Sequence, residues 1–258
     1  AVLVINSYHI GYEWSDDIMV AIRDAFAATM PRANIYFEYL DSKRFPWDAE
    51  RSRIWADELK RRYQGIRFDA IIVSDDIAYR FILQHHQSVF ADVPVVFCGV
   101  NYFEPADIAG DPLITGVVQT VEFVGNVELI RKILPSVRRV YAIVDKSLTG
   151  EAYRQAIQAE AGQIPDVDIQ ILDGRDISFD DLLVALAHLE NNSAALMLLF
   201  LEDKDGTYLP QHITYPRIAA ASRVPVFQVT ESGLGFGLGG GYIQTGRSQG
   251  RTAALMAM

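Results

Sequence analysis

The residues of this chain best suited to chemistry lie in one short stretch near its start. Two tyrosines, a histidine and a tryptophan fall within seven consecutive positions, 8–14. Such rings offer faces for stacking, and their polar atoms, with a neighbouring serine hydroxyl, offer hydrogen bonds. This chemistry favours recognition of a small molecule, although Tyr12 and Trp14 could equally pack a helix onto a sheet. The candidate ligand-binding residues here are Ser7, Tyr8, His9, Tyr12 and Trp14.

Acidic and amide side chains follow several other apolar runs of the sequence. Residues 70–73 and 94–98 are two such runs, and each is followed at once by polar side chains. Carboxylates hold an amine through charge-assisted hydrogen bonds, but aspartates placed before a helix also serve as caps. The candidates in this group are Asp75, Asp76, Asn101, Tyr102, Glu202 and Glu231.

A predicted helix that opens at Thr149 and Gly150 offers a different kind of contact. Unpaired N–H groups at a helix N-terminus suit a carboxylate. Together with rings and carboxylates elsewhere, these two residues predict a small amphoteric ligand, such as an amino acid or a related aromatic metabolite, rather than a sugar phosphate.

Two motifs suggest enzymes but lack the required context. Residues 235–240 match the spacing of a dinucleotide fingerprint, yet neither the flanking elements nor a later acid fit that use. Residues 246–250 match the nucleophile elbow, but no acid or histidine follows Ser248. Residues 202–206 resemble the start of a calcium loop without its bidentate glutamate. We therefore expect no catalytic residues, no metal and no cofactor.

The predicted elements determine where these side chains lie. The first strand, at 2–5, is expected to lead into a helix that begins at Ser15 as its N-cap. Alternating strands and helices form a parallel sheet wound right-handedly, and ligands bind such sheets at the carboxyl ends of the strands. The strands expected in the first half are 2–5, 35–40, 70–73 and 94–98.

The same pattern recurs in the second half of the chain. It predicts an α/β fold of two doubly wound, Rossmann-like lobes with parallel sheets and a ligand cleft between them. We expect residues 1–118 to form the N-terminal lobe, rejoined by part of 240–258, and residues 119–239 to form the C-terminal lobe. The strands expected in the second half are 140–144, 167–172, 194–200 and 224–229.

Composition excludes several classes of protein. The net charge is −10 and no long basic cluster occurs, which argues against a nucleic-acid partner. The single cysteine, Cys98, excludes an internal disulfide and a thiolate metal cage.

No apolar run reaches the roughly 18 residues of a membrane span. The chain begins inside its first strand and ends in a helical pattern without a stop signal, so we interpret it as a trimmed segment.

Taken together, the loop at 7–14, the turn at 74–76 and the run at 94–101 resemble the ABC transporter substrate-binding protein family, with the type I periplasmic-binding fold. Residues 115–117 and 239–250 extend the similarity over nearly the whole chain. More narrowly, the sequence is similar to extracytoplasmic sensor domains of bacterial histidine kinases and diguanylate cyclases. The resemblance implies two lobes, a small-molecule ligand and a periplasmic location.

These observations lead to a specific expectation of function. The chain is expected to be the periplasmic sensor domain of a signal-transduction protein, such as the histidine kinase of a two-component system, anchored in the inner membrane. A free periplasmic solute-binding protein of an ABC transporter is the alternative. The sequence is compatible with both a monomer and a homodimer. It does not specify the identity of the ligand or the type of output domain.

Overall fold

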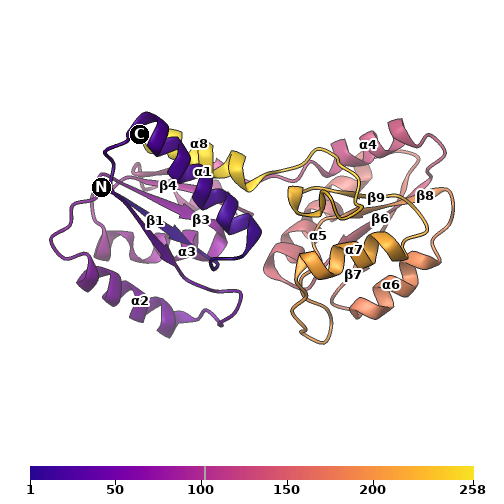
Figure 1. Cartoon of the computed structure of the whole chain (residues 1–258), viewed down its shortest axis with the longest axis horizontal. Coiled ribbons are helices and arrows are strands. Elements are labelled where there is room, and N and C mark those ends of the chain that lie inside the picture. The colour runs from indigo at the N-terminus through magenta and orange to yellow at the C-terminus, as the bar shows by residue number, and fades with distance from the viewer. Residues whose placement is uncertain (102) are drawn as a thin grey trace. The chain divides into compact units, whose positions relative to one another are not determined.

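The computed structural model describes residues 1–101 and 103–258, and its backbone divides into two compact units. Unit 1 comprises Ala1–Thr120 and Thr245–Met258, and unit 2 comprises Val121–Gln244. The chain therefore leaves unit 1 after residue 120 and returns to it after residue 244 (Figure 1). Tyr102, one of the predicted ligand-binding residues, lies outside the described residues.

Unit 1 is built on a parallel five-stranded sheet with the strand order β2-β1-β3-β4-β5. Every residue of β1, β3 and β4 is buried, as expected for apolar runs covered on both faces. The strands are β1 (Val2–Asn6), β2 (Ile35–Tyr39), β3 (Ala70–Ser74), β4 (Val95–Val100) and β5 (Ile114–Val118).

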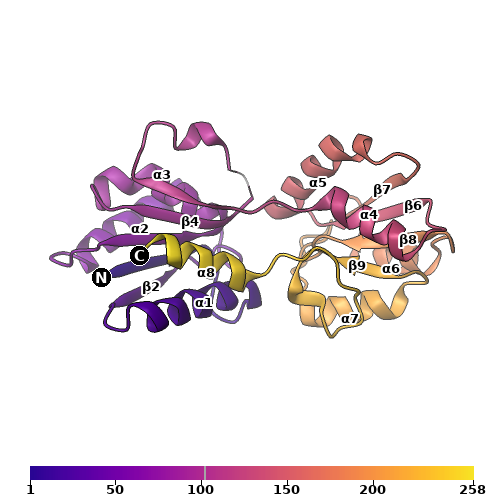
Figure 2. The same ribbon diagram turned by 90° about the horizontal axis from the view of Figure 1, so that it is seen from above.

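Helices cover both faces of this sheet (Figure 2). Alternate residues of β1 supply the two cores, so that Val2 and Val4 face one pair of helices while Leu3 and Ile5 face the other. The first face carries α1 (Glu13–Thr29) and α8 (Gly246–Met256), and the second carries α2 (Ala49–Arg62) and α3 (Asp75–Val89). A short 3-10 helix, η1 (Pro105–Asp107), follows β4.

Unit 2 repeats this plan with a parallel four-stranded sheet in the order β7-β6-β8-β9. Its strands are β6 (Arg139–Val144), β7 (Asp168–Asp173), β8 (Ser193–Met197) and β9 (Val226–Gln228). Its helices are α4 (Phe123–Ile133), α5 (Leu148–Glu160), η2 (Ala161–Gln163), α6 (Phe179–Ala187), α7 (Gln211–Ala221) and η3 (Glu231–Gly233). The helices α6 and α7 pack on one face of the sheet around buried Tyr215 and Phe200.

Several predicted boundaries are wrong. The strand expected at 194–200 ends at Met197, and the strand expected at 224–229 spans only Val226–Gln228. The start of the first helix also differs. Helix α1 begins at Glu13 rather than after Ser15, and Tyr12 occupies the N-cap position. Ser15 is buried inside the helix, where its hydroxyl donates to Asn6 Oδ1 at 2.7 Å. A serine that finds a side-chain acceptor on a neighbouring strand does not have to cap a helix end.

Candidate functional site

The strand order creates a switch point in each unit. In unit 1 the chain moves from β1 to β2 on one side and then to β3 on the other, so the loops after β1 and β3 diverge. In unit 2 the equivalent loops follow β6 and β8. Ligands bind open α/β sheets at such points, at the carboxyl ends of the strands. The candidate site of unit 1 therefore lies at the loops after β1 and β3.

Ser7 joins these two loops in unit 1. Its hydroxyl donates to the carbonyl of Ser74 at 2.6 Å and accepts the N–H of Ala78 at 2.8 Å. Because Ser7 is fully buried and both of these bonds are internal, it fixes the edge of the site.

The aromatic loop after β1 is folded onto itself. The rings of Tyr8 and Tyr12 meet edge to face with centroids 5.3 Å apart, and His9 lies 6.0 Å from Tyr12. Tyr8 is only 9% exposed, whereas His9 and Tyr12 are half-buried. The ammonium of Lys43, from the loop after β2, lies 4.3 Å from the ring centroid of Tyr8 and 4.9 Å from that of Tyr12.

The side chain of Trp14 is packed in the core rather than exposed at the surface. It is 8% exposed, belongs to the core beneath α1 and donates its indole N–H to Asp75 Oδ1 at 2.9 Å. This geometry favours the packing role that the sequence left open for Trp14. The residue affects the site through the carboxyl group that it holds.

Asp75 is an unusual carboxyl group at the end of β3. It is 2% exposed, has a φ of +68°, and its Oδ2 has no hydrogen-bond partner among the described residues. Burial raises the pKa of Asp75 to about 8, the charge of Asp76 adds to the shift, and the bond from Trp14 opposes it. A side chain at Gly99 would place its Cβ 3.2 Å from Asp75 Oδ1, so glycine leaves room for the carboxyl.

Asp76 has a different environment although it is the next residue. Its Oδ1 accepts the backbone N–H of Asn101 and its Oδ2 accepts the side-chain amide of Asn101, both at 3.0 Å. Asp76 is 4% exposed. The carboxylate therefore positions the loop after β4. Neither aspartate caps α3 with its side chain, since Ser74 occupies the N-cap position.

The loop after β2 contributes residues that the sequence analysis did not single out. Arg44 donates to both oxygens of Asp41 at 2.7 and 2.6 Å, and Asp41 also lies 3.5 Å from His9 Nδ1. Burial lowers the pKa of His9, and the nearby charge of Arg44 lowers it further. The only sequence signal for this loop is its charge, Asp41 to Arg44 directly after a strand, because it has no periodicity.

In unit 2, Asp145 organises the corresponding switch point. Its carboxylate accepts from the backbone and hydroxyl of Ser147 and from the N–H of Leu201, so it ties the loop after β6 to the loop after β8. A Cβ at Gly150 would lie 2.2 Å from the carbonyl oxygen of Asp145. Gly150 also donates its N–H to the Ser147 hydroxyl, so packing and capping account for its position. Thr149 is half-buried beside it.

A buried ion-pair network supports this edge of unit 2. Arg154 is 2% exposed and donates to both oxygens of Asp173 at 2.7 and 2.9 Å and to the carbonyl of Asp145. Burial alone would raise the pKa of Asp173, yet hydrogen bonds from Arg154 and Arg175 hold it below its ordinary value. Sequence reasoning missed Arg154, because an arginine within a helical pattern gives no sign of burial.

The remaining predicted residues of unit 2 lie at strand ends. Glu202 follows β8, is half-buried, and pairs with Lys146 at 3.5 Å. Glu231 begins η3 after β9 and is also half-buried. The structure thus gathers eight predicted residues at the carboxyl edge of unit 1 and four at that of unit 2. They are Ser7, Tyr8, His9, Tyr12, Trp14, Asp75, Asp76 and Asn101, and then Thr149, Gly150, Glu202 and Glu231.

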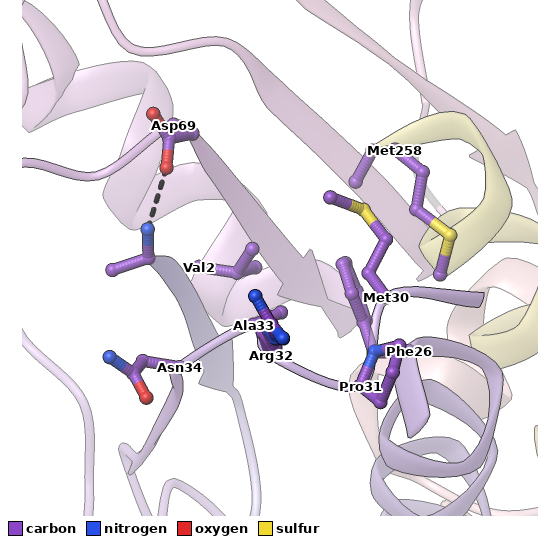
Figure 3. A pocket seen from close by; sticks show the side chains of 11 residues that line it. Val2, Phe26, Met30, Pro31, Arg32, Ala33, Asn34, Asp69 and Met258 are labelled. Atoms are coloured by element: carbon purple, nitrogen blue, oxygen red, sulfur yellow. Dashed lines mark hydrogen bonds and ion pairs between the residues drawn. The ribbon is translucent and has the colours of Figure 1, made fainter. Parts of the chain in front are cut away.

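A separate hollow of about 590 Å³ lies at the opposite edge of the unit 1 sheet (Figure 3). It is lined mainly by apolar groups from the ends of α1 and α8, including Phe26, Met30 and Met258. The terminal amine of Ala1 pairs with Asp69 at 2.6 Å on its margin. Because it lies at the amino ends of the strands, this hollow is distinct from the candidate site.

Among the described residues, no group of three histidine, cysteine, aspartate or glutamate side chains could hold a metal ion. No helix in the described part of the chain is long and apolar enough to cross a membrane.

Known structures share this arrangement over almost the whole chain. An ABC domain from Streptococcus pneumonia in complex with L-Trp matches 99% of this chain and 83% of its own, with 14% identity and a TM-score of 0.62. A ligand-free, open substrate-binding protein from Clostridium difficile matches the same shares, with 12% identity and a TM-score of 0.66. The chain has the type I periplasmic-binding fold. This confirms the fold class expected from the sequence.

The type I periplasmic-binding fold also occurs in regulators. A LacI transcriptional regulator from Lactobacillus brevis matches 100% of this chain and 92% of its own, with 12% identity and a TM-score of 0.64. No protein-family model matches the chain, and no curated protein matches it in sequence. At such identities the similarity establishes the fold, and function has to be argued from the site.

Proposed function

We propose that this chain is a periplasmic domain that binds a small molecule at the carboxyl edges of its sheets and performs no chemistry. The observation that carries the proposal is the built constellation at the unit 1 switch point. There the indole N–H of Trp14 is hydrogen-bonded to Asp75, and the carboxylate of Asp76 is hydrogen-bonded to Asn101. Both lie beside an aromatic loop that includes His9. Preorganised polar and aromatic groups at this place in the fold are typical of a binding site.

The reactive residue types support binding rather than catalysis. Cys98 is fully buried, and burial raises the pKa of its thiol far above the ordinary value, so it is a poor nucleophile. Ser248 lies in the first turn of α8, where its N–H is bonded to the hydroxyl of Thr245. The expected absence of catalysis is therefore part of this proposal.

The sensor role is the specific form of the proposal. We infer a domain of a bacterial histidine kinase or diguanylate cyclase, anchored in the inner membrane in the full-length protein, on the basis of the sequence resemblance. A free solute-binding protein is the second candidate, favoured by similarity to a substrate-binding protein and to an L-Trp complex. The gene sequence beyond residue 258 distinguishes the two candidates. A membrane helix followed by an output domain would identify a sensor, and a stop codon would identify a free solute-binding protein.

A thermal-shift screen of amino acids, aromatic acids and amines, purines and sugars tests the binding function. A ligand at a hundredfold excess over its Kd should stabilise the folded chain by about 2.7 kcal/mol, which a melting curve detects easily. His9→Ala should reduce this stabilisation. His188→Ala, a matched change at an exposed position at the end of α6, should leave it intact. The proposal fails if no compound in the screen raises the melting temperature.

A further inference from the structure

Three polar side chains lie together at the carboxyl ends of β1 and β3 in unit 1. Asn6 ends β1, Ser74 ends β3, and the register of these parallel strands pairs the two residues directly. Both side chains are on the face of the sheet that α1 and α8 cover, because the residues two positions earlier belong to that core. Asp75 follows Ser74 and also reaches α1, since its carboxyl accepts the indole N–H of Trp14.

The orientation of the Asn6 amide is fixed by its partners. Its Oδ1 accepts the backbone N–H of Tyr8 and the hydroxyl of Ser15, both at 2.7 Å. Because a backbone N–H can only donate, the amide cannot be turned to place its nitrogen at this position. The Nδ2 group at the other end of the amide is therefore a donor, and it has no partner among the described residues.

The other two groups lack partners as well. The Ser74 hydroxyl and Asp75 Oδ2 form no hydrogen bond with any described residue. Burial is the main cause of the raised pKa of Asp75, and the Ser74 hydroxyl is one of the groups that lower it. Ser74 and Asp75 are therefore neighbours, although their polar atoms do not have the geometry of a hydrogen bond. Trp14 and Ser15, consecutive residues of α1, bind Asp75 and Asn6, which brings these two close as well.

Bulk water cannot satisfy these groups. Asn6 and Ser74 are 0% exposed, and Asp75 is 2% exposed. A buried polar group without a hydrogen bond destabilises the folded state, and in proteins the great majority of such groups are bonded to protein or to an ordered water. A common partner for all three groups would remove this cost.

The chemistry of the three groups limits what that partner can be. Asn6 Nδ2 can only donate, the Ser74 hydroxyl can donate or accept, and Asp75 Oδ2 accepts when ionised and donates when protonated. A metal ion cannot accept the N–H of Asn6, and an anion would be repelled by an ionised Asp75. A small neutral molecule that both accepts and donates satisfies all three, and water is the smallest such molecule.

We propose that Asn6 Nδ2, Ser74 Oγ and Asp75 Oδ2 bind one ordered water molecule inside unit 1. Three partners are typical of a buried water. Through Asn6 the water also supports the aromatic loop, because the other end of the same amide binds the backbone of Tyr8. The inference goes beyond the proposed binding function, and it applies to the chain without any ligand.

A high-resolution crystal structure of the intact, unliganded chain tests the assignment directly. A water should lie within about 2.6–3.2 Å of all three atoms. In solution, the side-chain amide protons of Asn6 should show a nuclear Overhauser effect to water with the sign of a long-lived bound molecule. This signal should persist when Ser15→Ala and Ser74→Ala are combined, since that variant lacks the nearby hydroxyls whose exchanging protons could imitate a bound water.

Two substitutions of Ser74 separate the water from the hydroxyl. Ser74→Ala leaves the space and two partners, so the water should remain. Ser74→Val fills the space with methyl groups, so it should expel the water and lower the melting temperature by about 3–6 °C relative to Ser74→Ala, because Asn6 and Asp75 lose their partner. Cys98→Val is the matched control, since Cys98 pairs with Ser74 on β4 and should not affect the water.

Four outcomes overturn the inference. The first is direct hydrogen bonding of the three groups to one another or to another protein group, with no water between them. The second is a metal ion at the position, recognised by contacts of about 2.3–2.6 Å. The third is an Asn6 amide without a bound-water signal. The fourth is equal melting of Ser74→Ala and Ser74→Val. None of these outcomes bears on ligand binding, which the thermal-shift screen tests separately.

Discussion

At the scale of single residues, two adjacent aspartates in the candidate site behave differently because their surroundings differ. Asp75 lies beneath Gly99, accepts the indole N–H of Trp14, and has one oxygen without a described partner. Asp76 has both oxygens bound by Asn101. Burial without full compensation favours the neutral acid of Asp75. Sequence shows two equal acids, and only the fold separates them.

Asp75→Asn should therefore change the pH dependence of stability. The pKa of Asp75 is raised from 3.8 to about 8, so its neutral form is favoured by folding. That contribution is fully present below the unfolded pKa and is lost as pH rises through about 8. Relative to wild type, Asp75→Asn should gain on the order of 3 kcal/mol in unfolding free energy between pH 5 and pH 8. Urea unfolding at several pH values measures this gain.

The control for this prediction is Asp24→Asn, which alters an exposed aspartate of α1. Its unfolding free energy should follow that of the wild type across the same pH range, because the substitution lies on the exposed surface of α1. If Asp75→Asn also runs parallel to wild type, Asp75 is ionised in the folded protein and the account of its environment is wrong.

At the scale of elements, the Gly246–Ser248–Gly250 motif has a structural explanation. A Cβ at Gly250 would lie 2.4 Å from the carbonyl oxygen of Ile18, and one at Gly246 would lie 2.8 Å from that of Trp14. The two glycines thus let α8 approach the backbone of α1, the helix that carries Trp14. The motif that sequence reasoning rejected as a nucleophile elbow is, in the structure, a helix-packing contact.

Gly250→Ala should therefore destabilise the protein even though alanine favours helix. Overpacking against a backbone carbonyl costs about 1–3 kcal/mol, which should exceed the roughly 1 kcal/mol that alanine gains in helix propensity. Ser248→Ala, two residues away on the exposed side of α8, should stay within about 0.5 kcal/mol of wild type. Thermal or urea unfolding compares the two variants, and equal stabilities would contradict this account of the contact.

Much of the element level could be predicted from the sequence, for a physical reason. Strands buried on both faces leave uninterrupted apolar runs, and those at 70–73 and 140–144 lie within the observed β3 and β6. Errors arose where a tertiary bond replaced a local one, as for Ser15 and Asn6. The position of Lys43 over the rings of Tyr8 and Tyr12 could not be predicted, because it depends on the proximity of two loops, and loops carry no periodic signal.

At the scale of the whole molecule, the two units differ in how they are assembled from the chain. Unit 2 is one continuous segment with its own sheet and its own core around Tyr215. Unit 1 is discontinuous, since α8 comes from the far end of the chain. Ala253 and Ala254 of α8 are fully buried in the core that also contains Ile18 and Phe26. The folding of unit 1 therefore depends on a segment that follows unit 2 in the sequence.

This difference predicts how fragments of the chain behave. Residues 121–244 expressed alone should fold, because the described core around Tyr215 is built from residues of unit 2. Residues 1–120 alone should not reach a native state, since loss of α8 uncovers the apolar face of α1 and a domain has only about 5–15 kcal/mol of stability to lose. Joining residues 245–258 to residue 120 through a flexible linker should restore folding, because it returns α8 to unit 1.

Cooperative melting followed by circular dichroism distinguishes the three fragments. The linked fragment carrying Gly250→Ala is a control, because this substitution weakens the contact between α8 and α1. Cooperative melting of residues 1–120 at the same temperature as the linked fragment would show that α8 is dispensable to unit 1.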